Sequence, residues 1–131
     1  MWVKPKTDWA ATDYFNIEDY NRIKNNLDHM RGMSLVLYAT FPYTAMGNDK
    51  TYTDYFYADE INLFETNLAN INTYTYAQDI GTVKTFYPNQ PFINYEELNR
   101  LESSMLKIYN LLYGQTNGRR RLAFTLGRRA L

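Results

Sequence analysis

Residues 14–30 read YFNIEDYNRIKNNLDHM, and this pattern returns twice in the 131-residue chain. It aligns without a gap with residues 55–71, YFYADEINLFETNLANI, and with residues 92–108, FINYEELNRLESSMLKI. One asparagine anchors the alignment in each copy: Asn21, Asn62 and Asn99. An internal repeat of this kind indicates that one structural unit is used three times.

Apolar residues recur in each copy at intervals of three, four and three, the spacing that forms one face of an α-helix. These stripes are Tyr20, Ile23, Leu27, Met30; Ile61, Phe64, Leu68, Ile71; and Leu98, Leu101, Met105, Ile108. Two acidic residues precede each stripe, where the positive end of a helix dipole favours them. In two copies an asparagine, Asn16 or Asn94, stands at the N-cap position with an acidic residue three places later. The fold class is therefore expected to be mainly α, with three amphipathic helices and a repeated helix-start motif.

The centre of the core is expected to take two residues from each stripe: Ile23, Leu27, Phe64, Leu68, Leu101 and Met105. Each helix is preceded by an aromatic, turn-rich arm that we expect to be extended, and the Lys-Thr pairs at 6–7 and 84–85 align Trp9 with Tyr87. The helices are expected to begin near Ile17, Ala58 and Tyr95. The first is expected to continue past Gly32, the second to end near Asn72, and the third to end at Tyr113 with Gly114 as its stop.

Two domains are predicted: a three-helix repeat domain with an N-terminal arm at 1–114, and a basic C-terminal docking tail at 115–131. Residues 115–118 are expected to form a polar hinge, and residues 122–126 a short strand-like segment. The tail contributes five arginines to a chain whose formal net charge is zero. Contact with nucleic acid, docking on an acidic protein by strand addition, and a disordered solubilising tail are the three interpretations. Docking is the favoured one.

The composition argues against several classes of function. There is no cysteine and a single histidine, His29, without partners at catalytic or metal-ligand spacing. We therefore expect no catalytic residue, no cofactor and no metal site, and hence no enzyme. No apolar stretch approaches the ~20 residues of a membrane helix. Thirteen tyrosines and seven phenylalanines exceed what so small a core buries, so some are expected on the surface, in contact with other chains.

Partner-binding residues are expected in the repeats and in the tail. The amide of the repeated asparagine has both a donor and an acceptor, and it could bind backbone from a neighbouring arm or subunit. Alternatively, it is a polar flank residue retained by duplication. The predicted set is Trp9, Asn21, Arg22, Asn62, Asn99, Arg100, Arg119, Arg120, Arg121, Phe124, Arg128 and Arg129.

The phrases DYNRIKNNL, NRLESSM and KTDWAATDYF resemble small structural proteins of tailed bacteriophages and prophages of Gram-positive bacteria. The resemblance covers about a third of the chain. The second copy departs from it, with Leu63 where Arg22 and Arg100 stand. The resemblance implies a multi-copy virion part, made in the host cytoplasm, without cofactor or enzymatic activity.

The expected function is a tail or baseplate adaptor, or a fibre-attachment protein. Its partners would be other virion proteins and further copies of itself in a symmetric assembly, without membrane contact, and nucleic acid is not the favoured partner. Two alternatives remain open: a nucleic-acid-binding protein at a phage head or connector, and a three-helix interaction domain of the host cytoplasm.

Overall fold

The computed structural model describes residues 2–54, 58–75, 77–82, 85–87 and 93–129, with side chains described as far as Gly118. Across these residues the chain forms three α-helices and no β-strand: α1 (Ile17–Leu37), α2 (Ala58–Tyr74) and α3 (Tyr95–Arg129). The mainly α fold predicted from the repeat is confirmed.

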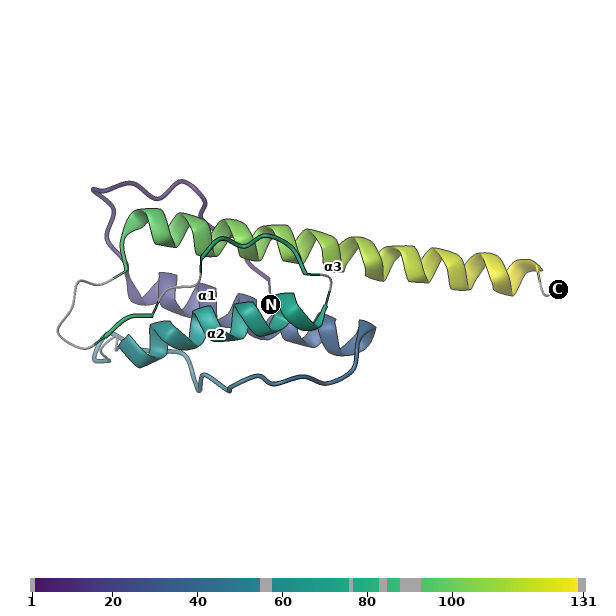
Figure 1. Ribbon diagram of the computed structural model, residues 1–131, viewed down its shortest axis with the longest axis horizontal. Coiled ribbons are helices and arrows are strands. Elements are labelled where there is room, and N and C mark those ends of the chain that lie inside the picture. Colours follow the sequence, from purple (N-terminus) through teal and green to yellow (C-terminus); the bar gives the residue numbers. More distant parts are fainter. Residues whose placement is uncertain (1, 55–57, 76, 83–84, 88–92, 130–131) are drawn as a thin grey trace.

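The three helices run in the same direction, so all three begin at one end of the bundle (Figure 1). A long connection returns along the bundle before each of α2 and α3, and the N-terminal segment runs in the same backward direction before α1 (Figure 1). Parallel neighbours need such long crossovers, since a short loop joins only antiparallel helices. The ~20-residue spacing between the repeated helices is thus a requirement of the topology.

The core is built from the repeated stripes. The six residues predicted for its centre are at most 1% exposed, and the remaining stripe residues are also buried. Tyr20 and Phe64 place their ring centroids 5.0 Å apart between α1 and α2. The connections add further buried apolar side chains: Trp9, Phe41, Ile80 and Ile93. The arms therefore belong to the core as much as the helices do.

The helix starts follow the capping chemistry of the sequence. The backbone N–H of Asn16 donates to Asp19 Oδ2 at 2.9 Å, and the N–H of Glu97 donates to Asn94 Oδ1 at 2.9 Å. These bonds satisfy donors that have no partner within the helix. As expected, α1 continues past Gly32, and α2 ends two residues later than expected.

The predicted conformation of residues 115–129 is wrong. Gly114 does not end α3, and the expected hinge at 115–118 and strand-like segment at 122–126 are helical. A glycine in a helix costs about 1 kcal/mol relative to alanine, but it ends a helix only when it adopts a left-handed conformation. Among the described glycines, only Gly47 and Gly81 have positive φ. The run Arg119–Ala123 consists of strong helix formers, and this propensity outweighs the imperfect apolar alternation.

Candidate functional site: clamps and bridges between the repeats

The repeated asparagines are backbone clamps. Asn99 accepts the N–H of Trp9 through Oδ1 at 2.7 Å and donates from Nδ2 to the carbonyl of the same residue at 2.9 Å. Asn21 holds Lys50 in the same way, at 2.8 and 3.0 Å, and Asn62 holds Phe86 at 2.7 and 2.8 Å. An amide side chain can serve both groups of one residue because it carries a donor beside an acceptor.

The clamps connect the repeats in a closed order. Asn21 of α1 binds the arm that leads into α2, and Asn62 of α2 binds the arm that leads into α3. Asn99 of α3 binds the N-terminal arm that leads into α1, across 90 residues of sequence. The chain therefore closes a pseudo-threefold ring of helices and arms, although its two ends are not joined covalently.

A second set of polar side chains, five positions later in each helix, holds the other end of each arm. Asn26 binds both backbone groups of Val3, at 2.9 and 2.7 Å, and Asn67 binds those of Thr44 at 3.0 and 2.9 Å. Ser104 supplies only a hydroxyl, which donates to the carbonyl of Ile80 at 3.3 Å. The first clamped residue of each arm thus binds the helix into which that arm leads. The second clamped residue binds the preceding helix of the ring.

The two clamped residues of an arm are six positions apart in every repeat: Val3 and Trp9, Thr44 and Lys50, Ile80 and Phe86. Six extended residues span about 20 Å, so the clamps fix a constant length of arm along the bundle. This corrects the sequence alignment by one residue, because Phe86, and not Tyr87, takes the place of Trp9. Tyr87 is exposed.

Two arginine bridges join neighbouring helices. The fork of Arg22 on α1 binds Glu102 of α3 through Nε at 3.0 Å and Nη2 at 2.9 Å, while Nη1 binds Asp19 at 2.7 Å. Arg100 on α3 repeats the arrangement. It binds Glu65 of α2 through Nη2 and Glu97 through Nε at 3.0 Å. In both bridges an arginine pairs with the carboxylate three residues before it and with a buried glutamate on the preceding helix of the ring.

Both acceptor glutamates lie in the interior, with Glu65 1% and Glu102 0% exposed. Burial raises the pKa of each carboxyl, and the facing arginine opposes that rise. Glu102 also accepts the indole N–H of Trp9 and the backbone N–H of Lys6, the latter at 3.2 Å. This carboxylate therefore ties α1, α3 and the N-terminal arm together.

Among the residues that the structure describes, the third junction, between α1 and α2, has no such bridge. Leu63 stands at the arginine position and Lys24 at the glutamate position. Lys24 is buried and turns to the arm before α2, where Nζ binds Asp49 Oδ1 at 2.6 Å and the carbonyl of Gly47 at 3.1 Å. Leu63 of α2 therefore makes no contact equivalent to those of Arg22 and Arg100.

The structure thus brings six of the predicted partner-binding residues into one network inside this chain: Trp9, Asn21, Arg22, Asn62, Asn99 and Arg100. Their polar groups bind arms and helices of the same chain. The three asparagines bind backbone of a neighbouring arm, which is one of the alternatives predicted for them. The other six, Arg119, Arg120, Arg121, Phe124, Arg128 and Arg129, lie on the far part of α3, where side chains are not described.

Sequence reasoning missed the buried partners Glu65, Glu102 and Lys24. Their shared signal is an ionisable residue directly after the second residue of each stripe, beside the buried face of the helix. The charge differs among the copies, which concealed the equivalence.

The remaining chemistry is sparse. His29 lies beside the stacked rings of Trp2 and Tyr109, and burial lowers its pKa. The described residues contain no group of three or more potential metal ligands. Among the helices that these residues form, none is long and apolar enough to cross a bilayer. Comparison with protein-family models, curated proteins and solved structures finds no significant match to this chain.

Proposed function

We propose that this protein is a non-enzymatic structural component of a bacteriophage virion, serving as a tail or baseplate adaptor or a fibre-attachment protein in multiple copies. The observation that carries the proposal is the closed ring of arms and helices. Its polar side chains are used to hold backbone segments and neighbouring helices, and not to face a substrate.

The ring suits a part that bears load between other components. Separating any one helix would break a clamp at its arm, and at two junctions it would also leave a buried charge without a partner. The bundle therefore forms a stiff base from which α3 continues past the ends of α1 and α2 (Figure 1). The resemblance of DYNRIKNNL and NRLESSM to phrases of phage structural proteins favours the same role.

The proposal is tested on particles released by the phage or prophage that encodes the gene. Purified virions are analysed by quantitative mass spectrometry and by immunogold labelling with an antibody against the protein. We expect a fixed number of copies per particle, with label confined to the tail region. Recovery of the protein only from the soluble fraction of the cell would contradict the proposal and favour the host interaction domain.

One observation favours the second candidate, a nucleic-acid-binding protein. The five arginines after residue 118 lie on helical backbone without any acidic residue beside them in the sequence, an arrangement that can neutralise phosphates. Gel retardation of duplex DNA at two ionic strengths separates the candidates. Strong retention that falls steeply with salt would support nucleic-acid binding, whereas an adaptor protein is expected to leave the duplex unshifted at both.

A further inference from the structure

The far part of α3 extends beyond the rest of the bundle. Gln115 stands at the repeat position that Leu37, the last residue of α1, occupies, and its Oε1 accepts the hydroxyl of Tyr38 at 3.0 Å. Beyond Gln115, α3 continues for 14 residues to Arg129, a length of about 21 Å. Beyond Gln115, no other described segment runs beside α3 (Figure 1). We call residues 115–129 the α3 extension.

The charge of the chain is divided between this extension and the bundle. The extension carries five arginines and no acidic residue, so its formal charge is +5. Because the whole chain is neutral, with 14 basic and 14 acidic residues, residues 1–114 carry nine basic and all 14 acidic residues, a formal charge of −5. The neutrality of the sequence thus conceals two opposite charges of equal size.

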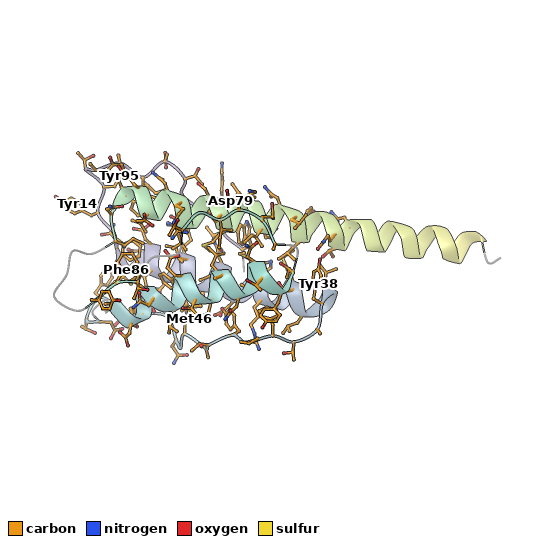
Figure 2. The ribbon with its side chains drawn as sticks, in the orientation of Figure 1. Tyr14, Tyr38, Met46, Asp79, Phe86 and Tyr95 are labelled. Atoms are coloured by element: carbon orange, nitrogen blue, oxygen red, sulfur yellow. The ribbon has the colours of Figure 1, made fainter. Side chains whose placement is uncertain are left out.

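The opposite end of the bundle carries exposed carboxylates and tyrosines. Glu18, Asp59 and Glu96 occupy the same position in the first turn of the three helices, and all three are exposed. Tyr52 donates to Glu18 at 2.9 Å, and Tyr95 to Glu96 at 3.3 Å. Figure 2 shows Tyr14 and Tyr95 at this end, and Tyr14 is 84% exposed. We call this surface the acidic end.

The two surfaces cannot meet within one molecule. Glu96 and Arg119 belong to the same continuous helix, and their separation of 23 positions corresponds to about 35 Å. Two extensions side by side would bring ten positive charges together, which opposes pairing of like with like. The complementary charges can therefore be joined only between the extension of one copy and the acidic end of another.

We infer that the α3 extension docks on the acidic end of a second copy of this chain, head to tail. Arginine is suited to this surface because its planar fork binds carboxylates in pairs and stacks on aromatic rings. Each exposed ion pair is weak alone, and the affinity comes from the set. A head-to-tail contact uses two different surfaces, so repetition produces a ring or a filament.

This inference deepens the proposed function. It rests on that function only in requiring that several copies of the chain lie next to one another. The test uses the purified full-length chain in sedimentation velocity at low and high ionic strength. The Debye length falls from ~30 Å at 0.01 M salt to ~3 Å at 1 M. We expect species larger than the monomer, growing with protein concentration at low salt and dissociating at high salt. A monomer under every condition would overturn the inference, whether or not the protein is found in virions.

Charge reversal identifies the two surfaces. The variant R119E/R120E/R121E and the variant E18K/D59K/E96K should each be monomeric alone. Mixed in equal amounts, they should associate again, because each then offers a surface complementary to the other. T66K/T73K, which adds charge at exposed positions of α2, serves as the control and should associate like the wild type.

The lysines of E18K/D59K/E96K lie in the first turns of the helices, where positive charge opposes the helix dipole. A second variant, E18Q/D59N/E96Q, therefore removes the negative charges without adding positive ones. It should weaken association at least tenfold while retaining the helical circular dichroism signal. Failure of the mixture to associate, or association that none of these variants alters, would overturn the inference. Retention of duplex DNA by a protein that stays monomeric would assign the extension to nucleic acid instead.

Discussion

The junction between α1 and α3 and the junction between α1 and α2 solve the same packing problem with different chemistry. In the first, Arg22 forms a fork with the buried Glu102. In the second, Leu63 replaces the arginine and Lys24 replaces the glutamate, so both partners have changed together. A change of only one would leave a buried charge uncompensated, which is far costlier than losing the pair.

An arginine–glutamate bridge is not needed for two repeats to pack. At the α1–α2 junction the apolar stripes pack without an arginine–glutamate bridge, and the hydroxyl of Tyr20 donates to Glu60 at 3.2 Å. This agrees with the small or negative net contribution of many buried ion pairs. We interpret the two bridges as devices that specify which helix docks on which. An arginine such as Arg22 packs favourably beside a buried glutamate such as Glu102, and unfavourably beside a buried lysine such as Lys24. These charges therefore help to specify the order of the repeats around the ring.

Removing one side of a bridge should have the largest effect. Arg22→Ala leaves Glu102 buried without its counter-charge, and we expect a loss of about 3–5 kcal/mol in the free energy of unfolding, measured by urea denaturation. Leu63→Ala, at the equivalent position of the junction without a bridge, should cost only about 1 kcal/mol. Equal losses from the two variants would show that the bridge has no special importance.

Removing a clamp should have the next largest effect. Asn99→Ala leaves the backbone N–H and carbonyl of Trp9 without their partner, at an expected cost of about 1–3 kcal/mol. Hydrogen exchange at Trp9 should rise more than exchange in α2. Asn110→Ala, at an exposed position of the same helix, is the control and should behave as the wild type. Unchanged exchange at Trp9 in Asn99→Ala would contradict the clamp.

Building the missing bridge at the α1–α2 junction should have a smaller effect. We expect K24E and L63R each to destabilise the protein, because each introduces a charge without its partner. The double variant should recover part of the loss, with a favourable coupling energy of about 1 kcal/mol in a double-mutant cycle. Additive losses would mean that the α1–α2 junction differs from the others in backbone geometry as well as in chemistry.

The smallest effect concerns pH. Burial raises the pKa of Glu102 above its ordinary 4.5, so this carboxyl contributes most to stability below pH 4.5, and the contribution declines as pH rises through the raised pKa. Glu102→Gln has no such proton. The free energy of unfolding of Glu102→Gln minus that of the wild type should therefore increase as the pH rises from below 4.5 to neutrality. Glu96→Gln, at an exposed position, is the control. A difference independent of pH would indicate that Glu102 has the same pKa in both states.

Much of the fold could be predicted from the sequence because its signals are local and repeated. The stripe from Ile23 to Met30, with Asp19 before it, marks a helix and its buried face within a few turns. Because the stripe and its acidic residues recur in three aligned copies, the pattern is not a coincidence of one segment. The same locality explains the error at Gly114, because a single turn-forming residue does not outweigh the helix-forming residues around Arg120. The short apolar alternation at 122–126 does not by itself distinguish a strand from a helix.

The candidate site was predictable only in part. The repeated amide of Asn99 identified a group able to bind backbone, but nothing near it in sequence names Trp9 as the residue bound. Glu102 gave still less indication, since its meaning depends on Arg22, 80 residues away. The exposure of Tyr14 and other aromatic residues was anticipated correctly from their number alone.

The sequence by itself determined the number of helices, their starting points and the side chains at the centre of the core. These depend on capping and periodicity, which act between residues a few positions apart. Only the tertiary structure decided that the helices run parallel, that Asn99 closes the ring on Trp9, and that Glu102 accepts Arg22. Clamps and bridges join segments from 23 to 90 residues apart, and such pairs exist only after the chain has brought them together.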